Sequence, residues 1–416
     1  MLTVLTPGEA LGVIFERFAP LLCPAEVVGL NDALGRVLHE DVVADDFVPG
    51  FDRSTVDGYA VISSDTFGCS ESIPAMLSLS GEVLMGHAAK GVLLPGSCIA
   101  VSTGGDLPEG ADAVVMLEFT EDFGSGFIGI NSPVAPGNNI IFKGDDVSPG
   151  VRILSAGAVL SPHDIGILAA LGFDQVSVRP SPVVGIISTG DELVVPSVTP
   201  GRGQVRDVNS PMLMAAAARC LAVPLCYGIV RDDESALRDS VRRAVLECDV
   251  VLVSGGSSAG TRDLTVSVFE SLGEILFHGI AMKPGKPTIL GVIDDKPVFG
   301  LPGHPVAAFF VFDLFVRPLV ARFMGASAER RSVTARLGEA VSSNHGREEY
   351  IQCTMYNVQC TIMDEGAGRD CVVAMPVRGK SGLIAGLAGT DGYICVPSDS
   401  EGLPKGAEVN VTLFAR

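Results

Sequence analysis

The chain has 416 residues, of which 47% are hydrophobic and 19% are charged, and its formal net charge at pH 7 is −20. This length exceeds what one hydrophobic core usually supports, so we expect several domains, and the composition excludes a largely disordered chain. The acidic balance disfavours nucleic acid and anionic membranes as partners, because both require a basic surface.

The cysteines and the apolar stretches indicate where the protein resides. Ten cysteines are scattered without the paired spacing of a zinc site, so we interpret them as free thiols and expect a cytoplasmic protein. The N-terminus lacks the charged region and cleavage site of a secretory signal. Charged residues or proline interrupt the two most apolar stretches, 211–230 and 305–323, so we predict no membrane span.

The first part of the chain predicts one helix followed by short strands. Thr6 can cap a helix over 7–18, with Pro7 at its first position. From 42 to 146, short β-type runs are separated by Gly, Pro and Asp, which indicates a mostly β domain. A short helix after Ser161 and an extended segment over 175–179 precede a proline-rich domain boundary.

From residue 183 the pattern alternates between strands and helices, which predicts a βαβ fold with a mostly parallel sheet. Strands are expected at 183–188, 225–230, 249–254, 288–293 and 297–301. Helices are expected at 209–221, from Asp232 or Asp233 to 247, and from Asp263 to 272. A long apolar helix that ends near 324 closes the domain. The residues 294–296 between the last two strands are a hairpin signal. After residue 330, short alternating runs with glycine turns predict a second β domain.

Five polar turns of the βαβ region carry most of the candidate site residues. They are 188–192, 231–233, 254–263, 282–287 and 301–305, and the first four follow the end of an apolar run. Ligands of an open parallel sheet bind beyond the carboxyl ends of its strands. We therefore expect the five turns to be walls of one site for a phosphorylated ligand and a divalent metal.

The turn 254–263 contains three glycines and four hydroxyl residues and leads into a helix near Asp263. Unobstructed backbone N–H groups beside a helix N-terminus bind anions. The spacing matches neither the dinucleotide-binding GxGxxG nor the P-loop, and an ordinary βα turn is the alternative that we disfavour. The candidate substrate-binding residues here are Ser254, Gly255, Gly256, Ser257, Ser258 and Gly260.

Lys283 and Lys286 lie three residues apart on a loop stiffened by prolines, which suits an oxyanion. A solvated surface turn explains this motif equally well when it is considered alone. In the next turn, His304 is interpreted as a hydrogen-bonded turn residue, because no Ser-His-Asp arrangement accompanies it.

Carboxylates follow several of the strands. Capping alone explains Asp232 and Asp263, but together with Asp191 and Glu192 they are expected to converge at one edge of the sheet. Mg²⁺ is usually held by one or two carboxylates together with phosphate oxygens. Two further polar segments, 51–60 and 102–112, cannot be placed at a site from residue chemistry alone.

Motifs in a fixed order then indicate a family. The segments are FDRSTVDGYA, STGGDLPEGADAVV, PGNNIIFKGDD, ISTGDELV, SGGSSAGTRD, MKPGKP, GLPGHPVAA and the final Ser381-Gly382. Over essentially its whole length the chain resembles the molybdopterin molybdenumtransferase family, which includes bacterial MoeA and the gephyrin E-domain. Two segments depart from the family pattern: its VSxGxxD is SSAGTRD here, and its GNP is Gly303-His304-Pro305.

The resemblance implies a multidomain α/β fold with β modules. Its parts are a central three-layer α/β domain with a mostly parallel sheet (1–19 and 180–327), a mostly β insertion domain (46–146), a small linking domain (20–45 and 147–179) and a C-terminal β-barrel-like domain (328–416). The family forms homodimers whose site lies between the α/β domain of one subunit and the insertion domain of the other. This gives Asp57 and Thr103 a place among the catalytic residues.

The activity implied by the resemblance is the last step of molybdenum cofactor biosynthesis. Molybdate is inserted into adenylylated molybdopterin, with Mg²⁺-dependent release of AMP. The resemblance implies that Asp191, Glu192 and Asp232 position the metal, and that Asp263 orients the pterin and its phosphates. It also implies that Lys283, Lys286 and Ser381 bind molybdate, in a pocket shaped by Pro302 and Pro305.

Three alternatives remain at this point. One is an ATP-dependent molybdopterin adenylyltransferase, which the GTRD ending of the 254–263 turn also resembles. Another is a paralogue that handles tungstate. A non-enzymatic scaffold is the weakest of the three, because the sequence shows no long linker or partner-binding tail.

Overall fold

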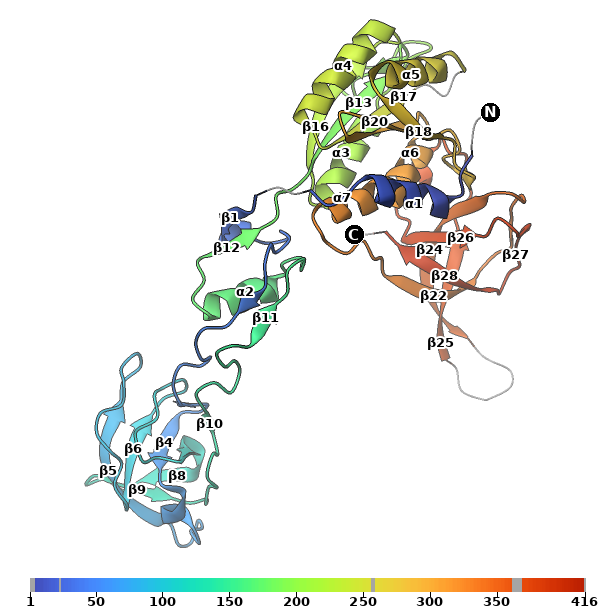
Figure 1. Ribbon diagram of the computed structural model, residues 1–416. Helices are drawn as coiled ribbons and strands as arrows, with labels where there is room; N and C mark the ends of the chain where they lie inside the picture. Colours follow the sequence, from blue (N-terminus) through green and yellow to red (C-terminus); the bar gives the residue numbers. More distant parts are fainter. Residues whose placement is uncertain (1–3, 22–23, 256–258, 361–368, 415–416) are drawn as a thin grey trace. The chain divides into compact units, whose positions relative to one another are not determined.

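The computed structural model describes residues 4–21, 24–255, 259–360 and 369–414, and the side chains of 259–263, 358–360 and 369–371 lie outside that description. The chain divides into two compact units, one of residues 1–26, 35–37 and 178–416 and the other of residues 27–34 and 38–177. The helices in the described part of the chain are too short or too polar to span a bilayer. The multidomain α/β fold predicted from the sequence is confirmed (Figure 1).

The unit of residues 27–34 and 38–177 consists mainly of short strands. Its largest sheet has the strand order β7-β4-β6-β5-β9-β8. The bounds are β4 Gly58–Val61, β5 Ala75–Val83, β6 Ser97–Val101, β7 Ala113–Met116, β8 Thr120–Asp122 and β9 Phe127–Ile130. Neighbouring residues of one strand are buried in different clusters, as Ala60 and Val61 show, so both faces of this sheet are covered.

Three two-stranded pairs, one α-helix and three short 3-10 turns complete this unit. The pairs are β1 (Glu26–Gly29) with β12 (Gln175–Val178), β2 (Val42–Val43) with β11 (Arg152–Leu154), and β3 (Arg53–Ser54) with β10 (Ile140–Ile141). The helix α2 (Pro162–Ala170) begins at a capping box, in which the Ser161 hydroxyl accepts from the N–H of Asp164 and the Asp164 carboxylate accepts from the N–H of Ser161.

In the other unit, a six-stranded sheet forms the centre of the α/β domain, with the order β16-β13-β17-β21-β20-β18. The bounds are β13 Val183–Thr189, β16 Val223–Val230, β17 Val250–Gly255, β18 Glu274–His278, β20 Ile289–Ile293 and β21 Lys296–Pro302. The first four strands in that order are parallel, whereas β20 and β18 are antiparallel to their neighbours. The predicted hairpin joins β20 to β21, and Asp294 and Asp295 adopt positive φ angles of 50° and 58° at its turn.

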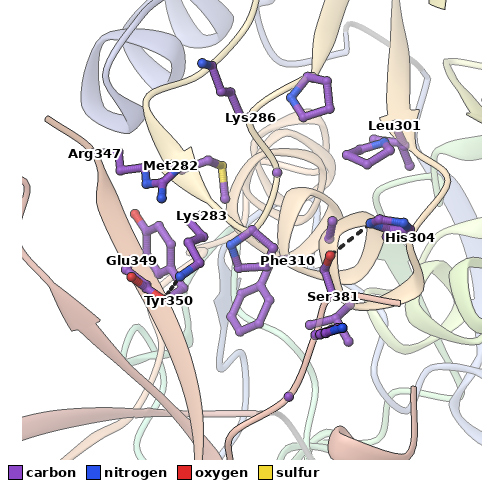
Figure 2. A pocket seen from close by; sticks show the side chains of 18 of the residues that line it. Met282, Lys283, Lys286, Leu301, His304, Phe310, Arg347, Glu349, Tyr350 and Ser381 are labelled. Atoms are coloured by element: carbon purple, nitrogen blue, oxygen red, sulfur yellow. Dashed lines mark hydrogen bonds and ion pairs between the residues drawn. The ribbon is translucent and has the colours of Figure 1, made fainter. Parts of the chain in front are cut away.

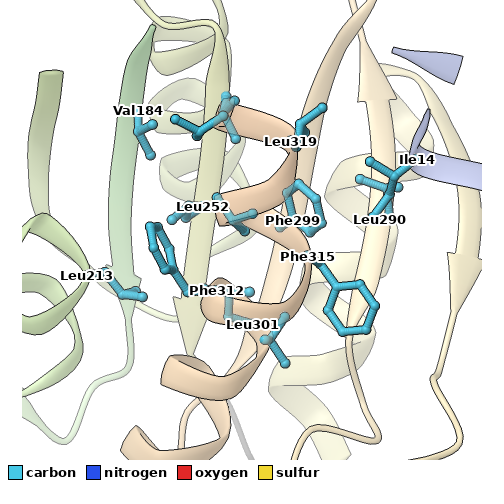
Figure 3. Close-up of a cluster of buried hydrophobic side chains, with 14 of the residues drawn as sticks. Ile14, Val184, Leu213, Leu252, Leu290, Phe299, Leu301, Phe312, Phe315 and Leu319 are labelled. Carbon is cyan, nitrogen blue, oxygen red and sulfur yellow. The ribbon is translucent and has the colours of Figure 1, made fainter. Parts of the chain in front are cut away.

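Helices cover both faces of this sheet, which makes the predicted three layers. The helices α4 (Glu234–Glu247) and α5 (Ala259–Leu272) pack on one face. The other face carries α1 (Pro7–Arg17), α3 (Asn209–Arg219), α6 (Pro305–Val311) and α7 (Arg317–Phe323), and a π-helical turn over Phe312–Val316 joins the last two. Figure 3 shows Phe312 and Phe315 of that turn packed beside Leu252, Phe299 and Leu301 of the central strands.

Local signals explain where most of these helices begin. Thr6 and Glu9 form a capping box at the start of α1, with Pro7 at the first helical position, as predicted. Asp233 rather than Asp232 caps α4, because its carboxylate accepts from the N–H of Ala236. The prediction that a helix opens at Asp263 is wrong by one turn, since α5 begins at Ala259. Aspartate is favoured as a cap but also near a helix N-terminus, because the helix dipole stabilises negative charge there, so Asp263 does not have to mark the start.

The C-terminal domain is a closed barrel. Its strands follow the order β24-β25-β22-β28-β26, and a further pairing of β24 with β26 closes the ring. The bounds are β22 Ser332–Leu337, β24 Glu348–Cys360, β25 Arg369–Pro376, β26 Gly392–Val396 and β28 Glu408–Leu413. A short strand of the α/β domain, β19 (Met282–Lys283), pairs in parallel with β24 and so attaches that domain to the barrel.

Buried charges and aromatic rings also connect the barrel to the α/β domain. The carboxylate of Asp313 forms an ion pair with Arg330, and the Nε of Arg317 lies 3.8 Å from the same carboxylate. All three side chains are at least four-fifths buried, and burial lowers the pKa of both arginines. Beside them, the ring of Phe310 packs edge-on against Tyr393, with 5.4 Å between the ring centres.

We expect Asp313→Ala to destabilise the unit strongly, because it leaves two buried guanidinium groups without their carboxylate. Removing one partner of a buried ion pair typically costs about 3–5 kcal/mol. Urea-induced unfolding followed by circular dichroism measures the change. The control is Asp295→Asn, which removes an ion pair between the exposed Asp295 and Arg17, tolerates the positive φ of this turn position and should leave stability almost unchanged. Equal effects of the two substitutions would contradict the prediction.

Candidate functional site

A cavity of about 780 Å³ lies where the α/β domain meets the barrel (Figure 2). The α/β domain contributes the segment 282–287, the ends of β17 and β21, and the start of α6. The barrel contributes the beginning of β24 and the loop 377–381. Three of the five predicted turns, those at 254–263, 282–287 and 301–305, therefore contribute to one site.

The charged side chains that line the cavity are mostly cationic. They are Lys283, Lys286, Arg347, Arg378 and Lys380, together with one carboxylate, Glu349. The Nζ of Lys283 is 2.6 Å from the Oε1 of Glu349, and the hydroxyl of Ser343 donates to the other oxygen at 2.9 Å. Glu349, the only lining carboxylate among the described residues, is thus paired, and Arg378 lies 3.7 Å from Glu339 outside the lining, so the excess of cations gives the cavity a charge that favours an anion.

Two buried polar atoms of the cavity walls have no partner. The Nε of Arg347 and the Oε1 of Gln352 are buried, and no described residue forms a hydrogen bond with either atom. Buried polar groups are nearly always hydrogen-bonded in folded proteins. One donor and one acceptor in the wall of a cationic cavity therefore fit a polar ligand.

His304 and Ser381 lie opposite each other in the cavity. The Nδ1 of His304 is 2.9 Å from the Oγ of Ser381, so the hydrogen bond expected for this histidine joins two domains (Figure 2). Pro302 lines the cavity at the end of β21, whereas Pro305 begins α6 beside it.

Glycines at two positions permit close approaches in the walls. A Cβ atom at Gly255 would lie 2.4 Å from the carbonyl oxygen of Thr189, so this glycine is needed where β17 passes β13. At Gly285, φ is 120° and a Cβ atom would meet Met282 and Val311 at 3.0 Å. Part of the glycine pattern that predicted an anion loop thus reflects the packing of neighbouring segments.

The anion loop itself is described only at its ends. Ser254 accepts a hydrogen bond from the Nδ2 of Asn209 at 2.7 Å, and Gly260 lies in the first turn of α5. Gly256, Ser257 and Ser258 lie outside the described residues, as does the side chain of Asp263. Their assignment to phosphate and pterin binding stays a prediction.

The carboxylates expected to hold Mg²⁺ follow β13 and β16, away from the cavity lining. The N–H of Asp232 donates to the Oδ1 of Asp191 at 3.4 Å, and the hydroxyl of Thr189 donates to the Oδ1 of Asp232 at 2.9 Å. Glu192 is exposed beside them. In the part of the chain that the structure describes, no three metal-binding side chains form a group that could hold an ion.

In the other unit, Asp57 and Thr103 are direct neighbours. The N–H and the hydroxyl of Thr103 both donate to the Oδ1 of Asp57, at 2.7 Å and 3.1 Å. Asp57 is exposed, and no described residue forms a side-chain hydrogen bond with its other carboxylate oxygen, which leaves that oxygen for a partner or a ligand. Both residues come from the polar segments that residue chemistry alone could not place.

Apart from Ser381, which the family resemblance supplied, sequence reasoning missed the barrel side of the cavity. Arg347, Glu349, Gln352, Arg378 and Lys380 were not singled out, and Asn209 was considered only as part of a helix start. A charged cluster at the start of a strand was the only available signal, and such clusters are usually solvated.

Comparisons with known proteins account for this architecture. The model of the MoeA N-terminal region (domain I and II) matches residues 5–172, that of a probable molybdopterin binding domain matches 185–322, and that of the MoeA C-terminal region (domain IV) matches 334–414. A protein of Methanocaldococcus jannaschii that is named for molybdopterin biosynthesis is 34% identical over 97% of this chain and 96% of its own length.

Two further relatives agree. The molybdopterin molybdenumtransferase of Bacillus subtilis is 32% identical over 94% of this chain and 90% of its own length. The crystal structure of the molybdopterin biosynthesis MoeA protein from Pyrococcus horikoshii superposes with a TM-score of 0.83 at 36% identity, covering 99% of this chain and all of that one. The resemblance seen in the sequence motifs is confirmed, and the chain belongs to the MoeA family.

Proposed function

We propose that this protein is a molybdopterin molybdenumtransferase, which inserts molybdate into adenylylated molybdopterin and releases AMP. The observation that carries the proposal is the cationic cavity in a chain whose net charge is −20. The names of the relatives support the same reaction. A cytoplasmic location, inferred from the scattered cysteines, is part of the proposal.

The cavity would bind molybdate as its oxyanion substrate. Among the described residues Lys286 forms no ion pair, so its ammonium is available, whereas Lys283 is shared with Glu349. The unpaired Nε of Arg347 supplies a further donor. Charge-assisted hydrogen bonds to an oxyanion are the strong ones, and several donors around one tetrahedral anion would fix its orientation.

The residues at the ends of β13 and β16 fit Mg²⁺ only together with a substrate. The neighbouring Asp191 and Asp232 offer carboxylate oxygens, and Glu192 lies beside them. Since Mg²⁺ is usually held by one or two carboxylates plus phosphate oxygens and water, the lack of a larger cluster among the described residues agrees with this mode. When bound, the ion would neutralise negative charge that develops on the phosphate oxygens.

We further propose that the protein acts as a homodimer. In the proposed assembly, Asp57 and Thr103 of one subunit face the α/β domain of the other, where Asp263 orients the pterin and its phosphates. The two hydrogen bonds from Thr103 support this by fixing one oxygen of Asp57 and leaving the other for the site.

Two alternative substrates require separate tests. An adenylyltransferase would consume ATP without needing molybdate, so product analysis with ATP and unmodified molybdopterin distinguishes it. A tungstate-handling enzyme would use the same cavity, because tungstate has the same charge and shape. Competition between the two oxyanions in the insertion assay decides between them.

The carboxylate role predicts that Glu192→Gln folds normally but loses Mg²⁺-dependent release of AMP. The amide keeps the size of the side chain and removes the charge that would attract the cation. AMP release is measured against Mg²⁺ concentration, with Glu274→Gln, an exposed residue of β18, as the matched control. A Glu192→Gln curve identical to the control would exclude this residue from metal binding.

For the lysines, we expect Lys286→Met to weaken molybdate binding roughly ten- to a hundredfold, the loss of one charge-assisted hydrogen bond. Methionine keeps most of the apolar stem. Lys283→Met should also lower stability, because it leaves the buried Glu349 with only the Ser343 hydroxyl. In the double variant Lys283→Met/Glu349→Gln, the stability should recover while the binding of molybdate stays weak.

Calorimetric titration with molybdate and thermal unfolding separate these two effects. Lys405→Met, an exposed lysine outside the cavity, is the control. If all the variants bind molybdate as the control does, the cavity is not the oxyanion site.

The homodimer predicts complementation between damaged subunits. Asp57→Ala and Asp263→Ala should each be inactive alone, because in the proposed assembly they damage opposite sides of one shared site. After subunit exchange, a mixed dimer keeps one intact site and should recover up to about half of the activity per dimer. Exchange is verified with differently tagged chains. No recovery despite proven exchange would place the whole site within a single subunit.

A further inference from the structure

The His304–Ser381 pair is held in place from both domains. His304 directly precedes α6, and Ser381 lies in the loop after β25. Besides the 2.9 Å contact between their side chains, the N–H of Val306 donates to the carbonyl oxygen of Ser381 at 3.1 Å. With Nδ1 committed to serine, Nε2 is the ring nitrogen left for a ligand of the cavity that His304 lines (Figure 2).

The number of hydrogens that this pair offers depends on the charge of the ring. In a neutral imidazole only one nitrogen carries a proton. Either the serine hydroxyl donates to Nδ1 and Nε2–H is free, or Nδ1–H donates to Oγ and the hydroxyl hydrogen is free. The neutral pair thus offers one hydrogen to the cavity. In the imidazolium both nitrogens carry protons, so Nε2–H and the serine hydroxyl are free together.

A bound dianion favours the second state. Histidine is the side chain whose proton ordinarily exchanges near neutral pH, and negative charge beside the ring stabilises the imidazolium. The charged groups that share this cavity are Lys283 and Lys286 on the 282–287 segment, Arg347 and Glu349 on or beside β24, and Arg378 and Lys380 on the loop that carries Ser381. The single carboxylate among them is paired with Lys283, so it does not supply the negative charge that a dianion would bring to the ring.

We propose that His304 and Ser381 together bind the tetrahedral oxyanion, and that the imidazole takes up a proton when the dianion binds. This assignment rests on the proposed function, because it deepens the oxyanion site of that reaction. The family pattern has asparagine at this position. An asparagine can hydrogen-bond to serine but cannot become a cation near neutral pH, so the substitution by histidine makes oxyanion capture proton-linked in this chain.

Titration calorimetry of the full-length protein with sodium molybdate tests the proposal. Phosphate-free buffers with different ionisation enthalpies give the number of protons taken up per anion bound. The variants are His304→Asn, which keeps a hydrogen-bonding side chain, and the control His345→Asn, an exposed histidine outside the cavity. Molybdate binding by each protein is measured at several pH values between about 6 and 8, the range in which histidine ordinarily exchanges its proton.

The wild-type protein and the control should take up close to one proton per anion at the upper end of this range. Their affinity for molybdate should fall by up to about tenfold for each unit by which the pH rises, because binding is linked to protonation. His304→Asn should bind more weakly at low pH, with the difference shrinking as pH rises, and should show neither the proton uptake nor the slope.

Two results would overturn the proposal, and they differ in what else they affect. Wild-type binding without proton uptake, or a His304→Asn variant with the same uptake and slope as wild type, removes the role of His304 and leaves the oxyanion cavity intact. A wild-type protein that binds no molybdate at any pH overturns the oxyanion cavity itself, and with it the proposed function.

Discussion

The cavity depends on a short strand that the α/β domain contributes to the barrel. β19 pairs in parallel with β24, so that Lys283 lies in register with Glu349, and the two side chains form an ion pair at 2.6 Å. On the other side, the N-terminal segment holds the same stretch, because the N–H of Ala281 donates to the carbonyl oxygen of Leu5 at 2.7 Å. A loop anchored on two sides keeps its cations at fixed positions, which is the preorganisation that an anion site requires.

The local charge of this cavity opposes the charge of the whole chain. At physiological ionic strength, charges more than about 8 Å apart are largely screened in solvent. The five cations around the cavity therefore favour an anion there, although the chain as a whole carries −20. The buried Nε of Arg347, with which no described residue forms a hydrogen bond, agrees with this, since a buried donor without a partner is costly.

Local patterns in the sequence predicted much of the α/β domain. The continuous apolar run of β13 indicated a strand covered on both faces, and every residue from 184 to 190 is buried. The cap of α1 and the hairpin between β20 and β21 followed from side chains within a few residues of each other. The barrel half of the cavity could not be predicted in this way. Arg347 and Glu349 reach the site only because β24 pairs with β19, a contact between segments far apart in the chain.

Gly255 and His304 show why the candidate site was predicted only in part. Gly255 was interpreted as part of an anion loop, but the close approach of β13 would require glycine there without any ligand. His304 was interpreted as a hydrogen-bonded turn residue, and it does form such a bond, but with Ser381 of the barrel. In both cases the residue type was interpreted correctly at the local level. Its role depended on a residue distant in the sequence, which only the fold brings close.

The ion pair between the two domains also affects how an anion would bind. A dianion near Lys283 would compete with Glu349 for its ammonium group, and the carboxylate would keep the hydroxyl of Ser343 at 2.9 Å as a partner. Since β19 and β24 remain joined through the backbone, including the N–H of Glu348 that donates to the carbonyl oxygen of Ala281 at 3.0 Å, loss of the ion pair would not separate the domains. The backbone pairing holds the walls of the cavity, and the side-chain charges are thereby free to exchange partners when an anion enters.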